Sequence, residues 1–166
     1  MNSWIGILIA LSKSDQIKDI FLFVQHDLFD LGAQISVPGT PLLSRRHLTR
    51  IENAFEKLNG ELGTLKEFIL PGGVLSSAFG HVARTVCRRA ERQLVHLMEF
   101  QTTMEGGMDG GLELKRNHGW AEGFGISYLN RLSDLLFVAC RIENREGGGT
   151  DVLWERGKSS TTPPQA

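Results

Sequence analysis

Hydrophobic residues recur along most of this chain at spacings of three and four, which is the pattern of amphipathic helices. Strand-like alternation of apolar and polar residues is nearly absent, and no internal repeat is visible. The helical pattern is carried by five segments, at residues 2–13, 15–35, 44–58, 74–100 and 126–145. We therefore predict an all-α fold in which five helices form an antiparallel bundle.

Segments rich in glycine and proline separate these helices. Residues 37–41 predict a turn. Residues 101–125 show little periodicity and lack the Gly-Lys-Ser/Thr of a phosphate loop, so they predict a flexible insertion rather than a binding loop. We place one helical domain at residues 1–146. The tail at 147–166 begins with three glycines, and its end, which is poor in apolar residues, is expected to be disordered.

Composition is that of an ordinary globular domain. The 166 residues are 41% hydrophobic and 22% charged, which suffices for one domain with a sizeable core. A net charge of −1 argues against a general nucleic-acid binder, which would be clearly basic. The apolar N-terminal run lacks the basic lead of a signal peptide and the length of a membrane span. We therefore expect no nucleic-acid or membrane partner.

The two cysteines, Cys87 and Cys140, form neither a disulfide framework nor a metal-ligand spacing. Both fall on apolar faces of predicted helices, which predicts buried free thiols. Such thiols fit a reducing compartment, so we expect a cytoplasmic protein. The sequence predicts no dedicated metal site.

The most informative stretch is residues 83–92, Ala-Arg-Thr-Val-Cys-Arg-Arg-Ala-Glu-Arg. Arg84, Arg88 and Arg92 recur every fourth residue and so share one side of the predicted helix, with Glu91 placed to orient Arg88. The helix also carries an apolar stripe: Val82, Val86, Ala90, Leu94 and Leu97. Two interpretations stay open at this point. The arginines form either a solvated basic face or a site for a polyphosphate, which their planar charged groups suit.

Two further segments flank this helix in the sequence, namely residues 68–73 (Phe-Ile-Leu-Pro-Gly-Gly) and residues 128–137 (Tyr-Leu-Asn-Arg-Leu-Ser-Asp-Leu-Leu-Phe). Phe68 is either a loop aromatic that closes the end of the bundle or a ligand contact. Asn130 is either a satisfied core amide or a ligand contact. In the second helix, His26 and Asp27 are expected on the polar side, at the surface or in a subunit contact.

These three segments, in this order, resemble the PduO-type ATP:corrinoid adenosyltransferases, particularly the bacterial members. Residues 27–33 (Asp-Leu-Phe-Asp-Leu-Gly-Ala) and the pair Leu153-Trp154 fit the same family. The resemblance implies a ferritin-like helical bundle. It also implies transfer of the 5′-deoxyadenosyl group of ATP to Co(I) of a corrinoid such as cobalamin or cobyrinate diamide, in adenosylcobalamin biosynthesis, with release of triphosphate.

The resemblance also implies roles for individual residues. Phe68 matches an aromatic at the lower face of the corrinoid, where it leaves cobalt four-coordinate and easier to reduce. Arg84 matches an arginine that pairs with an aspartate, and Asn130 matches an ATP contact. The nucleotide-binding segment is matched by Arg88, Arg89, Ala90, Glu91 and Arg92.

Cofactors and partners follow from the same resemblance. Magnesium is expected on the triphosphate, and a flavoprotein reductase is the candidate electron donor for cobalt. Family members are homotrimers with ATP bound between subunits. Here the family's N-terminal phosphate loop and acidic pair are not seen before Met1, so we expect a truncated first helix, an Arg84 without its aspartate, and impaired ATP affinity.

This departure leaves two other functions open. One is a non-catalytic corrinoid-binding or escort protein that has lost the ATP loop and binds corrinoid independently of ATP. The other is an oligomeric helix bundle without a ligand, whose melting temperature neither ATP nor corrinoid would shift.

Overall fold

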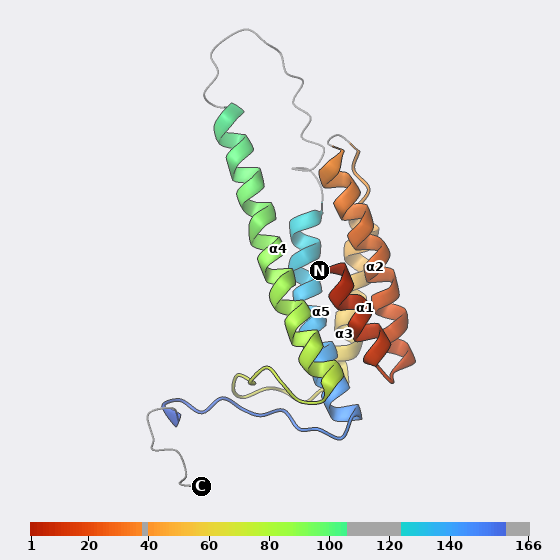
Figure 1. Cartoon of the computed structure of the whole chain (residues 1–166), viewed down its shortest axis with the longest axis vertical. Helices are drawn as coiled ribbons and strands as arrows, with labels where there is room; N and C mark the ends of the chain where they lie inside the picture. Colours follow the sequence, from red (N-terminus) through yellow and green to blue (C-terminus); the bar gives the residue numbers. More distant parts are fainter. Residues whose placement is uncertain (38–39, 106–123, 159–166) are drawn as a thin grey trace.

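The computed structural model describes residues 1–37, 40–105 and 124–158, and within them the chain forms a bundle of five helices (Figure 1). Their bounds are α1 Asn2–Leu11, α2 Asp15–Ser36, α3 Arg45–Gly60, α4 Leu75–Glu105 and α5 Gly125–Glu146. The only β-structure among the described residues is one isolated bridge. The predicted all-α class and the five-helix bundle are confirmed.

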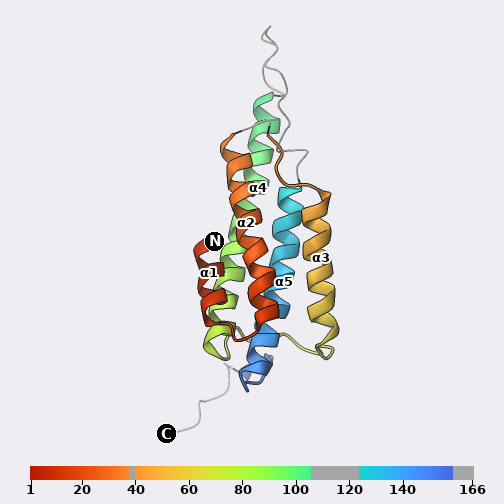
Figure 2. The ribbon, with the colours of Figure 1, turned by 90° about the vertical axis from the view of Figure 1, so that its right-hand side faces the viewer.

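Consecutive helices run in opposite directions, so the bundle is antiparallel along the chain (Figure 2). α4 and α5 make the most extensive contact, α3 packs on α5, and α1 packs on both α2 and α4. α1 is short and lies beside only the lower parts of α2 and α4 in these views. None of the described helices combines the length and hydropathy that a membrane crossing requires.

α5 is the central helix of the bundle. Thirteen of its 22 residues are buried, which is the signature of a helix covered on most sides. Tyr128, Leu132 and Leu136 are fully enclosed, and they meet Phe21 of α2 and Leu8 of α1 in a single core. Among the polar residues that α5 still exposes, Asn130 contacts Glu91 of α4 and Arg131 pairs with Glu52 of α3.

α4 differs from its prediction in two ways. It runs to Glu105 rather than 100, because no glycine or proline interrupts the sequence before Gly106. Residues 101–105, which were predicted to be part of a flexible segment, are thus helical, whereas residues 106–123 lie outside the described residues. The buried stripe also contains Ala83 and Cys87, while Val82 is exposed. The face of α4 that meets α5 is rotated by one position from the predicted stripe.

Asp27 is a second correction. It was expected on the polar side of its helix, at the surface or in a subunit contact, but it is buried within the bundle, while its neighbour His26 is exposed. Its carboxylate accepts a hydrogen bond from the Tyr128 hydroxyl at 2.8 Å and pairs with Arg50. A buried carboxylate is tolerated when its oxygens are satisfied in this way. Ser44 precedes α3 in a capping box, in which its backbone N–H donates to His47 Nδ1 at 3.1 Å.

The chain beyond α5 turns back onto the bundle. Residues 150–154, hereafter the strap, lie antiparallel to the Phe68 loop, residues 68–73. The Leu70 N–H donates to the Val152 carbonyl at 2.8 Å, and the Trp154 N–H donates to the Phe68 carbonyl at 2.7 Å. Both segments lie at the lower end of the bundle in Figure 1. The end of the tail, residues 159–166, lies outside the described residues.

Candidate functional site

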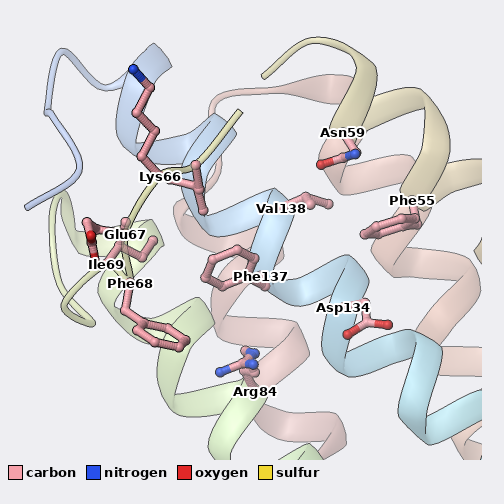
Figure 3. Close-up of a pocket in the computed structure, with 11 residues that line it drawn as sticks. Phe55, Asn59, Lys66, Glu67, Phe68, Ile69, Arg84, Asp134, Phe137 and Val138 are labelled. Carbon is pink, nitrogen blue, oxygen red and sulfur yellow. The ribbon is translucent and has the colours of Figure 1, made fainter. Parts of the chain in front are cut away.

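A cavity of about 730 Å³ opens at the lower end of the bundle, between the end of α3, the segment before α4, and the facing sides of α4 and α5 (Figure 3). α3 contributes Phe55 and Asn59, and α4 contributes Arg84. α5 contributes Asp134, Phe137 and Val138, and the preceding loop contributes residues 65–69. The lining is thus mainly apolar, with a few charged groups at its edges, as in many sites for large organic ligands.

Phe68 stands at the mouth of this cavity. Its side chain is 77% exposed, and the Trp154 ring lies edge-on to it with centroids 6.3 Å apart. Figure 3 shows the rings of Phe68 and Phe137 and the guanidinium group of Arg84 converging on one part of the cavity, whereas Lys66 points away. A phenylalanine closing a bundle end would be covered, so the exposed ring favours the ligand-contact interpretation.

Arg84 is a half-buried cation without an anionic partner among the described residues. Its guanidinium carbon lies 5.3 Å from the centroid of the Phe137 ring. Its Nε is buried and makes no hydrogen bond within the described structure. An uncompensated donor beside a cavity is costly unless a ligand or another chain completes it. Burial, and secondarily Arg84, also lower the pKa of the neighbouring His81.

Arg88, Glu91 and Asn130 form a hydrogen-bonded group that joins α4 to α5. Arg88 Nη1 lies 2.5 Å from Glu91 Oε2, and Asn130 Nδ2 donates to Glu91 Oε1 at 3.0 Å. The predicted orientation of Arg88 by Glu91 is confirmed. Asn130 is exposed, which excludes a buried core amide. Glu91 is buried and fixes both neighbours in position.

The remaining arginines of the segment face solvent. Arg89 and Arg92 are exposed, and within the part of the chain that the structure describes neither makes an ion pair. Ala90 is partly buried against the core. Three guanidinium groups along neighbouring turns of α4 therefore leave most of their donors open to an anion.

The two groups of residues lie along one continuous face. Arg84 and Arg88 are one turn of α4 apart, and Asn130 and Asp134 are one turn of α5 apart in the opposite direction. The cavity with Phe68 and Arg84 therefore adjoins the group with Arg88, Glu91 and Asn130. The structure brings the predicted residues together in two adjacent halves of one surface.

Sequence reasoning did not select Asp134 and Phe137 as site residues, although both line the cavity. Asp134 follows Asn130 by four positions, and that helical spacing was the available signal. Phe55 was not selected either, and its partly buried ring lines the cavity as well. Elsewhere, Asp27, Asp30 and His47 lie close together, but Arg50 and Tyr128 occupy the Asp27 carboxylate, which makes it a poor cation ligand.

Comparison with known proteins decides the family. The model of the cobalamin adenosyltransferase family matches residues 1–143. This chain belongs to the cobalamin adenosyltransferase family. The family and the fold predicted from the sequence are thereby confirmed.

Relatives in the family are similar over most of their length. A cobalamin adenosyltransferase of Cupriavidus metallidurans is 44% identical over 163 residues, which cover 96% of this chain and 78% of the relative. A corrinoid adenosyltransferase of Mycobacterium leprae is 40% identical over 167 residues, covering 94% of this chain and 78% of the relative.

Solved adenosyltransferase structures share the fold. An arginine-to-lysine variant of the PduO-type ATP:corrinoid adenosyltransferase of Lactobacillus reuteri, complexed with ATP, is 27% identical with a TM-score of 0.69 over 93% of this chain and 81% of that chain. A phenylalanine-to-alanine variant of the Lactobacillus reuteri enzyme, complexed with cobalamin and ATP, is 28% identical with a TM-score of 0.69 over 93% and 80%.

Proposed function

We propose that this adenosyltransferase transfers the 5′-deoxyadenosyl group of ATP to Co(I) of a cobalamin-type corrinoid and releases triphosphate. The observation that carries the proposal is that two candidate binding sites of different character lie next to each other on one face of α4 and α5. One is an apolar cavity with an exposed aromatic ring, and the other is a row of arginines that are largely free to bind an anion. A large macrocycle and a polyphosphate need such a pair.

The row formed by Arg88, Arg89 and Arg92, hereafter the arginine row, is the proposed triphosphate-binding site. Arg88 is held by Glu91, so its guanidinium group is oriented before any ligand arrives. Arg89 and Arg92 add two permanent charges nearby. Charge-assisted hydrogen bonds from planar guanidinium groups to phosphate oxygens are strong and directional. The arginine row would bind the ground-state nucleotide and stabilise the negative charge that develops on the leaving triphosphate.

The cavity is the proposed corrinoid-binding site. The Phe68 ring has no atom that can ligate cobalt, so at the lower face of the corrinoid it excludes both water and a nitrogen ligand. Cobalt without that ligand is more easily reduced to Co(I). The apolar surfaces of Phe55, Phe137 and Ile69 suit a macrocycle with methylated edges.

The reaction is a displacement at carbon. The electron pair of Co(I) forms the new bond to C5′ of the ATP ribose, and the C5′–O bond breaks with its electrons leaving on triphosphate. The protein contributes alignment of the two substrates, a surface from which water is excluded, and cations on the departing oxygens. No protein side chain needs to gain or lose a proton.

Variants of the Lactobacillus reuteri enzyme support this assignment. The phenylalanine and the arginine substituted in those variants stand 20 positions apart in that chain. Phe68 and Arg88 are also 20 positions apart. The enzyme with the substituted phenylalanine is complexed with both cobalamin and ATP, and the enzyme with the substituted arginine is complexed with ATP.

Magnesium is proposed as a companion of the triphosphate. Glu91 is the carboxylate beside Arg88, and Arg88 and Asn130 occupy its two oxygens. The described residues of this face therefore do not form a carboxylate cage, and the ion would be held by phosphate oxygens and water, as is common for magnesium.

We further propose that the chain works as a homotrimer with ATP between subunits, in the cytoplasm, and receives electrons from a flavoprotein reductase. The surface of α2 supports assembly. Leu22 is 51% exposed and Phe29 is 74% exposed, two turns apart on the same side of the helix, and exposed apolar groups of this kind mark contact surfaces. The uncompensated Arg84 is a further group that a neighbouring subunit could complete. The free, buried thiols agree with a reducing compartment.

An anaerobic assay with ATP, magnesium and chemically reduced cobalamin tests the function. We expect the Co(I) spectrum to decay as the light-sensitive cobalt–carbon product forms. Arg88→Ala should lower kcat/KM for ATP at least about a hundredfold, since it removes charge-assisted bonds made to the leaving group. Arg46→Ala, at an exposed arginine on α3, is the matched control and should leave turnover unchanged.

Two results would contradict the proposal. Stable Co(I) with cobalamin still bound would favour an escort protein. Co(I) that persists, together with no binding of cobalamin or ATP, would favour the remaining alternative, an oligomeric helix bundle without a ligand.

A further inference from the structure

The position of the Phe68 backbone is set from outside the bundle. Two hydrogen bonds join the Phe68 loop to the strap, one on either side of Ile69, at 2.8 and 2.7 Å. The strap also places the Trp154 ring edge-on to the Phe68 ring. Phe68 thus extends from a two-stranded pairing rather than from a helix, and such a pairing is weak when it stands alone.

The strap is itself fastened to α5. Asp151 Oδ2 accepts a hydrogen bond from Arg141 Nε at 2.9 Å, and Asp151 Oδ1 accepts one from Asn144 Nδ2 at 3.1 Å. The Arg141 side chain is only 10% exposed, so this ion pair is shielded from solvent. A shielded carboxylate with both oxygens bonded has little freedom to move.

Asn144 holds the Phe68 loop as well as the strap. Its Oδ1 accepts a hydrogen bond from the Val74 N–H at 3.1 Å, directly after the loop. Gly73, with φ of 98°, and Gly149 both lie against it, and a Cβ on either would come within 2.2 Å of Asn144 Oδ1. One buried amide therefore clamps the end of the loop and the turn that leads into the strap.

We propose that Arg141, Asn144 and Asp151 are positioning residues that act through the strap to hold Phe68 over the cavity. The inference rests on the proposed function, because it assigns Phe68 to the lower face of the corrinoid. A loop without this anchor would spread the exposed ring over many positions and would have to be ordered when the corrinoid binds. The arginine row is on another part of α4, so ATP binding should not depend on the strap.

The test compares Asp151→Ala with Glu155→Ala in the full chain. Asp151→Ala removes both hydrogen bonds that hold the strap to α5, whereas the ion pair that Glu155 makes within the described chain is with exposed Lys158. Electron paramagnetic resonance of bound cob(II)alamin with ATP reports the fraction of cobalt without a lower ligand. We expect that fraction to fall in Asp151→Ala, and kcat/KM for the corrinoid to fall about tenfold, with KM for ATP unchanged. Asp151→Asn keeps an acceptor for Asn144 and should restore part of the loss.

A second pair of variants changes the pairing between the strap and the Phe68 loop and leaves the contacts with α5 intact. Trp154→Pro removes the N–H that donates to the Phe68 carbonyl, whereas Trp154→Phe keeps both the N–H and an aromatic ring. The proline variant should reproduce the Asp151→Ala spectrum, and the phenylalanine variant should resemble the wild type. This pair decides the matter if Asp151→Ala does not fold.

Two results overturn the inference. The first is that Asp151→Ala and Trp154→Pro both fold and both keep the wild-type spectrum and the wild-type KM for the corrinoid, while the wild type is active. This result overturns the inference and leaves the proposed function standing. A wild-type chain that binds no cobalamin overturns the proposed function and this inference with it.

Discussion

At the scale of single residues, Asp27 shows how strongly one buried carboxylate can tie a bundle together. It is only 3% exposed, and it joins α2 to Arg50 of α3 and to Tyr128 of α5. Burial, followed by the charge of Asp27, raises the pKa of Tyr128 well above its usual range, so the hydroxyl stays a donor.

Tyr128→Phe removes that donor and leaves one Asp27 oxygen without its bond. We expect the free energy of unfolding to fall by about 1–3 kcal/mol, because a buried charged group loses a hydrogen bond. Urea unfolding followed by circular dichroism measures the change. The Tyr128→Phe/Asp27→Asn double variant should show non-additive losses, and strictly additive losses would argue against the coupling.

His81 should make stability depend on pH. Its pKa is lowered in the folded state, chiefly by burial, with Arg84 adding to the effect and Asp151 opposing it. In acid the unfolded chain therefore takes up a proton at His81 that the folded chain does not. The free energy of unfolding should fall as pH drops below about 6.5, by at most about 1.4 kcal/mol per pH unit for one proton.

The measurement is urea unfolding between pH 7.5 and pH 5. His81→Gln should show a shallower dependence than the wild type, whereas His26→Gln, at an exposed histidine, should not. Equal slopes for all three proteins would show that His81 takes no part.

Local sequence spacing predicted some of these residue contacts and could not predict others. Glu91 and Arg88 are three positions apart on one helix, so their contact follows from helical geometry alone. Asp27 is 23 positions from Arg50 and 101 from Tyr128, and its burial depends on how three helices meet. Its predicted place at the surface was wrong because the partners that offset its charge are distant in sequence.

At the scale of helices, α4 packs tightly against α5 at Gly80. A Cβ at this position would lie 2.5 Å from Cys140 Sγ and 3.6 Å from Leu8 Cδ1. Cys140 is fully buried, so its sulfur has little room to move. The missing side chain lets α4 fit against both α1 and α5 at the lower end of the bundle, where the cavity opens.

Gly80→Ala should therefore destabilise the protein, by about 1–3 kcal/mol, despite the better helix propensity of alanine. Thermal unfolding measures the loss. In the Gly80→Ala/Cys140→Ala double variant the new methyl group faces Cys140 Cβ at about 3.9 Å, an ordinary contact, so part of the stability should return. A double variant less stable than the sum of the single variants would contradict this packing.

The helices themselves were predictable because each carries its own apolar stripe, although α3 continues two residues beyond its predicted end, to Gly60. The strap was not predictable as a structural element. Residues 150–154 carry no alternating pattern, and they pair with a loop more than 80 positions away. Only the fold brings Asp151 to Asn144, which was unremarkable in the sequence.

At the scale of the whole molecule, the two thiols report on the integrity of the core. Cys87 and Cys140 are fully buried, and burial raises the pKa of each to about 12. At pH 8 only about one thiol in ten thousand is then ionised, and the thiolate is the reactive form.

We expect neither cysteine of the folded protein to react with a disulfide reagent over an hour at pH 8, and both to react within minutes in denaturing urea. Absorbance of the released thiolate counts the groups. Rapid reaction of one thiol without urea would mean that its helix opens separately from the rest.

The pairing of the strap with the Phe68 loop also sets an order of events during synthesis. Residues 68–73 leave the ribosome long before residues 150–154, which follow all five helices in the chain. The loop therefore stays without its backbone partner until residues 150–154 emerge, only a few residues after the end of α5. A released chain that ends after α5 should therefore fold to a nearly complete core in which Phe68 is not fixed. The proposed corrinoid site is therefore completed only after residues 150–154 have emerged.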